Sequence, residues 1–218
     1  MVTNNIWLQV GSLLPQIGRL AVVGIVGLCL TIGGELSQAL AGPPTDSMKG
    51  TIDEVLRIIR DKELKQAAKA EERRSLLEKA VAERFDYQEM SRRALGAPWN
   101  QLSDKEKQEF VSLFQTLLTS SYAEKVESYS GEGVQYLNER TEKDYAEVRT
   151  KILSGKTEIP LDYRLINHGT DWRVYDVVVD GVSLVNNYRG QFTKILRASS
   201  YPDLVDQLRK KSDKLKSP

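Results

Sequence analysis

The sequence predicts an α+β protein in which a curved antiparallel sheet of about four strands is wrapped by helices and preceded by a helical part. Two observations lead to this class. Between residues 51 and 130, apolar side chains recur three and four positions apart, as on one face of a helix. Beyond Gly133 the period falls to two, and short β-branched and aromatic segments alternate with turn residues, which is typical of an antiparallel meander.

The first 41 residues are predicted to be a secretory signal peptide. Arg19 precedes an uninterrupted apolar run over 20–30, and Ala39 and Ala41 have the spacing of a signal peptidase site. That run has 11 residues, fewer than the ~20 that a membrane-spanning helix needs, although an uncleaved anchor is the alternative. The sole cysteine, Cys29, lies in this run, so the exported chain would have no disulfide.

The exported part divides into a leader and one domain. Residues 42–50 are rich in turn formers and predict a flexible leader. A single domain is expected over 51–218. Its helical part covers 51–130, its sheet part 131–185, and its C-terminal helices 186–214.

Local signals place the helix ends. Helices are expected over 62–84 and 87–95, the second ending at Gly96 because glycine favours the backbone that follows a helix. Three pairs of residues have the spacing of a capping box, in which a hydroxyl and a carboxylate satisfy each other's backbone N–H groups. They are Thr51 with Glu54, Ser103 with Glu106, and Ser200 with Asp203.

Four strands are expected, over 134–140, 145–153, 159–167 and 172–180. Large apolar residues occupy both odd and even positions of the segment Val174–Val185. Since successive side chains of a strand point to opposite faces, this predicts that both faces of the sheet are covered. One face would be packed core and the other would border a cavity.

No catalytic or metal-binding constellation is evident. The sole histidine, His168, lies in a predicted surface turn without a partner serine, and no carboxylate loop has calcium-site spacing. Asp176 and Asp180 could form an acid and base pair, but aspartates near strand ends more often accept backbone amides. The 31 Lys and Arg nearly balance the 30 Asp and Glu, which disfavours nucleic acid as a partner.

Several motifs follow one another in a distinctive order. "MSRRALGAPWNQLSDKEKQEFVSLFQ" comes first, with "VRTKI" and "YRL" after it and then "DWRVYDVVVDGVSLVNNYRGQF". Together, behind a predicted signal peptide, they closely resemble the MlaC family of periplasmic phospholipid carriers, also called the toluene-tolerance auxiliary component. The resemblance covers about Thr51–Lys211.

The resemblance implies a soluble carrier that takes phospholipid across the periplasm of Gram-negative cells and maintains outer-membrane lipid asymmetry. Its partners would be an outer-membrane lipoprotein complex and an inner-membrane ABC transporter. The fold would be a nuclear-transport-factor-like cone with acyl chains inside and the head group in water. The family implies no catalytic residue and no cofactor, and a monomer is expected because the sequence has no heptads.

Large apolar residues between sheet and helices would surround the acyl chains, although each could equally be ordinary core. The candidates are Leu113, Leu117, Val134, Val148, Ile152, Tyr163, Leu165, Val174, Tyr175, Val177, Val179, Val182, Leu184, Tyr188 and Phe192. Polar residues near the mouth would touch the head group, unless they are simply exposed to solvent. These are Arg164, Asn186, Asn187 and Arg189.

Three other functions fit the sequence. The first is a carrier of hopanoid or another terpenoid lipid, which the identity of the bound lipid would reveal. The second is an exported enzyme on the same cone, using Asp176 or Asp180 with Tyr175 or Tyr188 and therefore requiring a perturbed carboxylate that faces the cavity. The third is a structural adaptor with a filled core and no ligand.

Overall fold

The structure is a computed structural model that describes residues 42–127, 129, 133–155 and 157–216. The described residues belong to one contact unit, which begins at residue 41. The predicted signal peptide over 1–41, with Cys29, lies outside the described residues. Within the described part of the chain, no helix combines the length and the apolar character needed to cross a bilayer.

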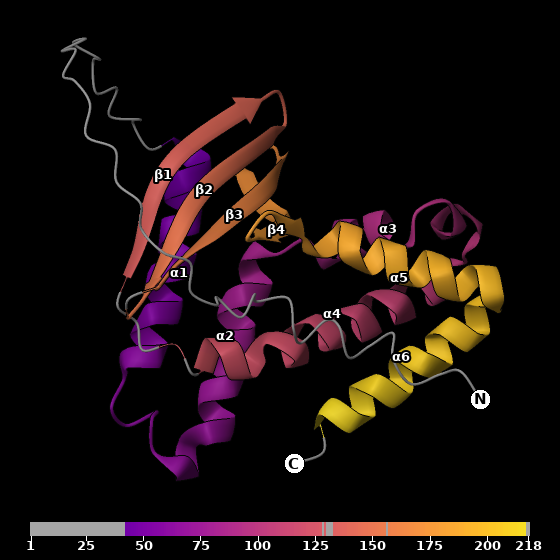
Figure 1. Ribbon diagram of the computed structural model, residues 1–218, viewed down its shortest axis with the longest axis horizontal. Helices are drawn as coiled ribbons and strands as arrows, with labels where there is room; N and C mark the ends of the chain where they lie inside the picture. The colour runs from indigo at the N-terminus through magenta and orange to yellow at the C-terminus, as the bar shows by residue number, and fades with distance from the viewer. Residues whose placement is uncertain (1–41, 128, 130–132, 156, 217–218) are drawn as a thin grey trace, which may run out of the picture. The chain divides into compact units, whose positions relative to one another are not determined.

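Helices lie before and after the sheet (Figure 1). Those before it are α1 (Pro43–Arg60), the 3₁₀ helix η1 (Ala67–Lys69), α2 (Ala70–Arg84), α3 (Tyr87–Leu95), the 3₁₀ helix η2 (Ala97–Gln101) and α4 (Asp104–Glu127). Those after it are α5 (Leu184–Ala198) and α6 (Tyr201–Lys216). The helix expected over 62–84 starts later, at Ala70, because Asp61 Oδ1 accepts the N–H groups of Glu63 at 2.8 Å and Leu64 at 3.1 Å and holds a turn there.

The sheet is antiparallel, with the strand order β1-β2-β3-β4-β5. The strands are β1 (Gly133–Glu142), β2 (Tyr145–Ser154), β3 (Thr157–His168), β4 (Asp171–Val179) and β5 (Val182–Ser183). The α+β class and the four predicted strands are confirmed, and β5 adds a short fifth strand. Asp180 and Gly181 join β4 to β5 with φ of +49° and +79°, as a two-residue hairpin turn requires.

The start of α1 corrects one expectation. Residues 43–50 are helical and are not a flexible leader. Prolines are tolerated in the first turn of a helix, where their missing N–H would have no partner. Two other N–H groups at this end have an acceptor on the sheet. Glu139 Oε2 of β1 accepts from Gly42 N at 3.2 Å and from Thr45 N at 2.9 Å. The cap of α1 is therefore a residue distant in sequence.

The capping boxes have different outcomes. Thr51 with Glu54 is wrong as a helix start, since both residues lie inside α1. Ser103 with Glu106 is confirmed: Glu106 Oε2 accepts from Ser103 N at 2.8 Å, and Ser103 Oγ accepts from Glu106 N at 3.4 Å. Ser200 makes the same exchange with Asp203 at the start of α6. The predicted end of α3 at Gly96 is also confirmed, with φ of +72°.

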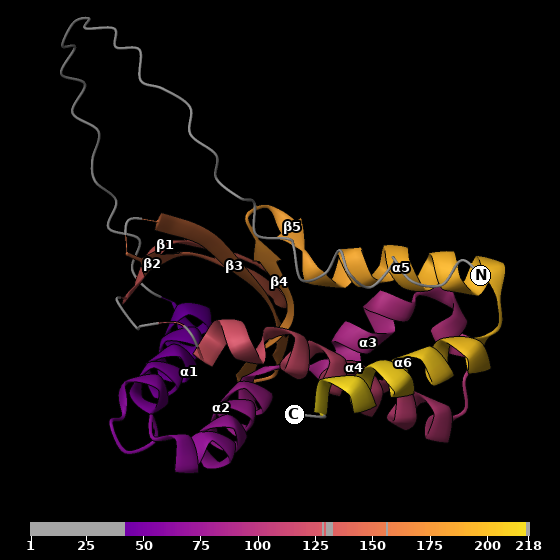
Figure 2. The same cartoon turned by 60° about the horizontal axis from the view of Figure 1, so that its bottom comes forward.

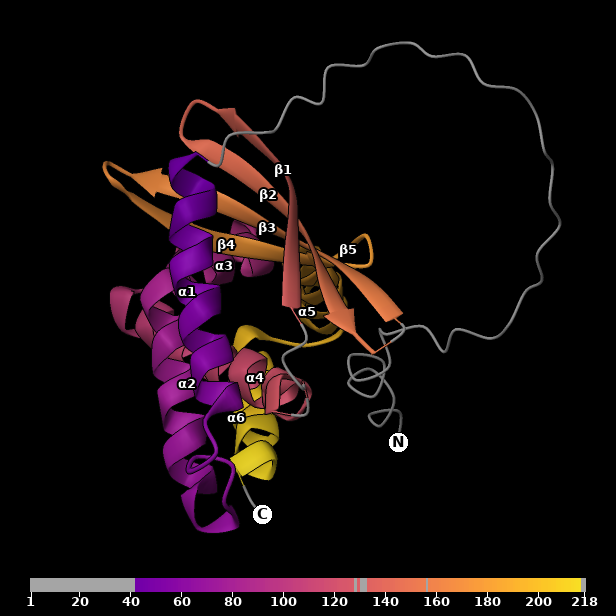
Figure 3. The same cartoon turned by 90° about the vertical axis from the view of Figure 1, so that its left-hand side faces the viewer.

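The sheet has two differently covered faces. α1 contacts β1, β2 and β4 on one face, which we call the α1 face (Figure 3). α3 and α5 contact β4 from the other side, and we call that surface the α3 face. Figure 2 shows α3, α4, α5 and α6 gathered beside β4. β4 is thus the strand at which the sheet meets the helices on both sides.

An aromatic cluster joins α4 and α5. Phe114 of α4 meets Tyr188 of α5 at 5.1 Å between ring centroids and Phe192 at 5.5 Å, both edge to face. Phe110 meets Phe192 at 5.6 Å in the same way. All four side chains are fully buried. Edge-to-face pairs of this kind add roughly 1 kcal/mol each beyond simple burial, so this cluster fixes α5 against α4.

We predict that Glu139→Ala lowers the free energy of unfolding by about 1 kcal/mol, because two N–H groups at the start of α1 lose their acceptor. Urea denaturation measures the change. Glu142→Ala is the matched control, since Glu142 pairs with Arg140 only at the surface, where their side chains are 74% and 78% exposed. Equal midpoints for the two variants would contradict the capping role of Glu139.

Candidate functional site

An apolar cluster fills the space between α1 and the α1 face of the sheet. The sheet contributes Ala146, Val148, Tyr163, Leu165, Trp172, Val174 and Val177, α1 contributes Met48, Ile52 and Leu56, and Leu184 completes the cluster. None of these residues is more than 9% exposed. A continuous surface of large apolar side chains between a helix and a curved sheet can be packed as core, and it can also surround an apolar guest.

A β-bulge in β4 places two of its valines on the same face of the sheet. Arg164 pairs with Asp176 and the next residue, Leu165, pairs with Val174, so Tyr175 is an extra residue in β4. Val174 and Val177 would point to opposite faces of a regular strand, yet both lie in the α1-face cluster. The bulge therefore accounts for Val174 and Val177 on the same face, whereas Val178, which is also buried, points to the other face.

The α3 face of the sheet is charged in its centre. Glu147 and Arg149 lie on β2, next to Arg164 of β3, and form ion pairs: Arg149 Nε is 2.8 Å and Arg164 Nε 3.6 Å from Glu147. This corrects the expectation that core lies on one face and a cavity on the other. The continuous apolar cluster described above lies on the α1 face.

The fifteen predicted lipid-contact residues divide into three groups. The first group belongs to the α1-face cluster or lies beside it. Its members in the cluster are Val148, Tyr163, Leu165, Val174, Val177 and Leu184, and Val134 and Val179 pack against them. Ile152 of β2 pairs with Val134 of β1 and with Ile159 of β3. Leu113, Leu117, Tyr188 and Phe192 lie on α4 and α5. Tyr175 lies on the α3 face, where its ring meets Tyr145 edge to face at 5.9 Å, and Val182 is 37% exposed in the hairpin.

The sequence analysis missed the contribution of α1. Met48, Ile52 and Leu56 recur four residues apart and line the cluster. Their spacing is the signal of one helix face, but turn-forming residues around Met48 led to the leader assignment. The N-terminal helix is therefore part of the candidate site.

Two tyrosine hydroxyls beside the cluster are buried without a hydrogen-bond partner in the described part of the chain. They belong to Tyr122 of α4 and Tyr136 of β1, whose rings pack against the cluster. Burial raises the pKa of each to about 12, so both are neutral donors at ordinary pH. By contrast, Tyr129 Oη donates to Gly133 O at 2.8 Å and accepts from Gly133 N at 2.9 Å. Unpaired buried hydroxyls are costly, which makes Tyr122 and Tyr136 candidates for contact with polar atoms of a ligand.

Asp176 has a structural role on the α3 face. It is 3% exposed and accepts from the backbone N–H of Val185 at 3.0 Å, from Ser183 Oγ at 2.6 Å and from Arg164 at 3.1 Å. These contacts fix the first turn of α5, as the more common reading of strand-end aspartates predicts. Asp180 is an exposed turn residue. Neither aspartate faces the apolar cluster.

His168 lies beside a single carboxylate. His168 ends β3 with its side chain 50% exposed, and its Nε2 lies 2.8 Å from Asp86 Oδ2. Across the described ranges, no three His, Asp, Glu or Cys side chains gather in a way that could hold a metal ion.

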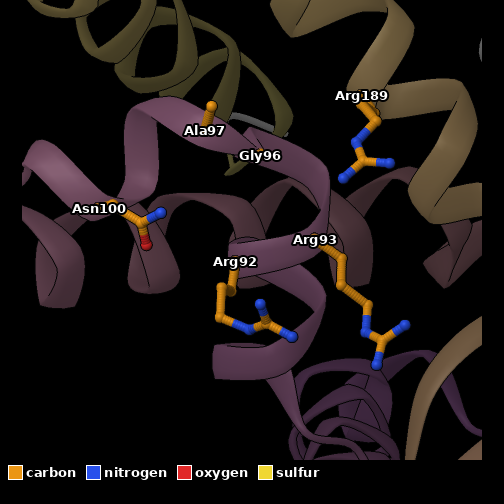
Figure 4. Close-up of a pocket in the computed structure, with 6 residues that line it drawn as sticks. All are labelled: Arg92, Arg93, Gly96, Ala97, Asn100 and Arg189. Carbon is orange, nitrogen blue, oxygen red and sulfur yellow. The ribbon is translucent and has the colours of Figure 1, made fainter.

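The four predicted head-group residues are scattered. Arg164 is held between Glu147 and Asp176 on the α3 face. Asn186 is exposed on α5, Asn187 is half-buried, and Arg189 reaches toward the end of α3. There Arg189 lines a pocket of about 370 Å³ together with Arg92, Arg93, Gly96, Ala97 and Asn100 (Figure 4). The sequence analysis did not connect Arg92 and Arg93 with Arg189.

The fold and the site define a class: an α+β protein whose open antiparallel sheet and N-terminal helix enclose an apolar cluster. The family model described as MlaC protein matches residues 49–210. The chain therefore belongs to the MlaC family, and the resemblance seen in the sequence is confirmed.

Two of the similar proteins are as follows. One is the intermembrane phospholipid transport system binding protein MlaC of Haemophilus influenzae, 23% identical over 122 residues, which are 53% of this chain and 57% of that protein. This chain thus spans little more than half the length of that relative. The other is the structure of a phospholipid-binding protein from Ralstonia solanacearum in complex with a phospholipid, 25% identical, with a TM-score of 0.69, covering 78% of this chain and 97% of that one.

We predict that Asp176→Asn lowers the free energy of unfolding by about 2 kcal/mol, because an amide cannot replace all the acceptor sites that Val185, Ser183 and Arg164 use. Thermal and urea unfolding measure the loss. Asp180→Asn is the control, because asparagine tolerates a positive φ at an exposed turn, and its stability should change by less than about 0.5 kcal/mol. Unfolding curves that coincide for the two variants would refute the structural role of Asp176.

Proposed function

We propose that this protein binds a phospholipid and carries it between membranes. The observation that carries the proposal is the phospholipid complex of the similar R. solanacearum protein, which matches this chain over 97% of its own length. The name of the H. influenzae relative points to the same activity. Support from this chain itself is the apolar cluster on the α1 face, which offers a surface of the required chemistry.

The acyl chains would lie between α1 and the sheet. Nine of the predicted residues are placed there or beside it: Val134, Val148, Ile152, Tyr163, Leu165, Val174, Val177, Val179 and Leu184. Exposing two chains of about 16 carbons to water costs on the order of 25 kcal/mol, at about 0.8 kcal/mol per methylene. An apolar interior offsets most of that cost, so lipid can pass between carrier and membrane complex with little net change in free energy.

The transport route is the finer part of the proposal. The carrier would act in the periplasm as a monomer, between an outer-membrane lipoprotein complex and an inner-membrane ABC transporter, and maintain outer-membrane asymmetry. The direction would be set by these partners or by ATP hydrolysis elsewhere, since binding alone does not favour one membrane. Loading would move α1 away from the sheet, because α1 is the element that closes the apolar cluster.

The alternatives make different predictions. A hopanoid carrier would use the same apolar surface and differs only in its ligand. An enzyme would need a free carboxylate in the cavity, and the contacts of Asp176 with Val185, Ser183 and Arg164 argue against that role. A structural adaptor would contain no ligand at all.

Native mass spectrometry of the protein purified from a periplasmic extract, followed by lipid extraction, tests the proposal. We expect a mass increment that matches one diacyl phospholipid per protein. A hopanoid in its place would favour the terpenoid carrier. Protein that comes out empty and cannot be loaded from liposomes would refute lipid binding.

We predict that Tyr136→Phe weakens lipid retention about threefold to tenfold, because the hydroxyl would donate to an ester or phosphate oxygen of the bound lipid. The delipidated variant should be as stable as the unmodified protein or more stable by up to ~1 kcal/mol, since an unpaired buried hydroxyl is removed. Retention is measured by transfer to acceptor liposomes, and stability by urea unfolding.

Tyr129→Phe is the matched control, since it removes a hydroxyl that already has two partners. It should lower stability by roughly 1 kcal/mol in the delipidated protein. If Tyr136→Phe instead lowered stability and left retention unchanged, Tyr136 would be an ordinary core residue.

A further inference from the structure

The pocket between α3, η2 and α5 gathers positive charge that no lipid-binding role explains. Arg92 and Arg93 come from the last turn of α3, and Arg189 comes from α5. Glu89 is the carboxylate that pairs with the first two, at 2.6 Å from Arg92 and 2.7 Å from Arg93. Arg189 forms no ion pair with any carboxylate in the described part of the chain. Two positive charges of the pocket therefore lack a counter-charge there.

The surrounding chain keeps this charge in place. The ring of Tyr175 lies under the guanidinium of Arg93, with 4.0 Å from Arg93 Cζ to the ring centroid, and a contact of this kind restrains the side chain. Neither α5 nor η2 contains an acidic residue. Arg93 is thus restrained, and neither α5 nor η2 supplies an anion to the pocket.

Gly96 lies against the third arginine. Gly96 adopts φ of +72°, which L side chains rarely tolerate, and a Cβ there would lie 3.7 Å from Arg189 Nε. Figure 4 shows Arg189 extending from α5 toward Gly96, with Ala97 and Asn100 on the adjoining wall. The pocket has a volume of about 370 Å³. The side chains of Arg92 and Arg93 extend from α3 away from Gly96 and Ala97 (Figure 4).

We propose that this pocket binds a phosphate group, in the form of a phosphate ester. A guanidinium presents paired N–H donors that match two oxygens of one phosphate. A phosphate monoester carries roughly 1.5 to 2 negative charges at pH 7, which balances the two uncompensated cations better than one carboxylate does. The volume exceeds that of a bare ion, and the amide of Asn100 can contact the hydroxyls of a small esterified alcohol.

The site is separate from the proposed lipid cavity. Arg93 rests on Tyr175, which lies on the α3 face, whereas the apolar cluster lies on the α1 face. The sheet stands between them, so the head group of a lipid held under α1 does not reach the pocket. The phosphate comes either from a soluble ester or from the head group of a lipid in a membrane that the protein touches.

Isothermal titration with inorganic phosphate and with glycerol 3-phosphate, at low ionic strength, tests the proposal. We expect saturable binding at one site, weakened at least ~10-fold in Arg189→Gln because a charge-assisted donor pair is lost. Arg189→Lys should also bind phosphate more weakly, since lysine keeps the positive charge but lacks the paired N–H donors of a guanidinium. Arg197→Gln, an equal charge change on the same helix outside the pocket, should bind as the unmodified protein does.

If Arg189→Gln and Arg197→Gln weakened phosphate binding equally, the effect would come from the net charge of the protein and not from the pocket, and the proposal would be overturned. Lipid-loaded and delipidated protein should bind glycerol 3-phosphate equally, and competition between bound lipid and the ester would overturn the separation of the two sites. The titration of the delipidated protein does not depend on whether the lipid carrier function holds, because it reports on the pocket alone.

Flotation with vesicles distinguishes the two sources of phosphate. Vesicles of zwitterionic lipid to which phosphatidic acid is added should recruit the protein, with loss in Arg189→Gln, if the phosphate belongs to a membrane lipid. Binding of glycerol 3-phosphate without recruitment assigns the pocket to a soluble ester. If neither binds while a hexaglutamate peptide does, the pocket is a docking surface for an acidic protein segment and the phosphate proposal is wrong.

Discussion

The extra residue at Tyr175 determines how both faces of the sheet are used. Because of this bulge, Val174 and Val177 both lie on the α1 face and complete a continuous apolar surface. The same shift places Asp176 beneath the start of α5, where it accepts the N–H of Val185. Tyr175 itself supports Arg93 on the opposite side. The apolar cluster, the anchoring of α5 and the arginine pocket thus all depend on one irregularity in β4.

Features encoded by neighbouring residues were predictable from the sequence. The end of α3 at Gly96 and the capping boxes at Ser103 and Ser200 each need only three or four consecutive residues, whose chemistry settles the backbone. The four main strands were also predictable, because alternation and turn residues are local signals. The general character of the site followed as well, since its valines, leucines and tyrosines are abundant in those strands.

Features that depend on contacts between distant residues were not predictable. α1 begins at Pro43 because Glu139, far along the chain, caps it, while the local signal at Thr51 pointed to the wrong start. The bulge at Tyr175 arises from the pairing of β4 with β3, so alternation in the sequence could not show that Val174 and Val177 lie on the same face. Tyr188 and Phe192 look equally apolar in sequence, yet they join α5 to α4 in an aromatic cluster.

The distribution of polar groups follows from the cost of burying charge. Beside the apolar cluster, the hydroxyls of Tyr122 and Tyr136 have no hydrogen-bond partner in the described part of the chain, and burial raises their pKa and keeps them neutral. A buried guanidinium there would cost several kcal/mol unless it were paired with an anion. The arginines instead line a pocket on the other side of the sheet, where Arg92 and Arg189 remain accessible to water. Neutral donors would suit the proposed exchange of an apolar guest, because each release then leaves no uncompensated charge in the interior.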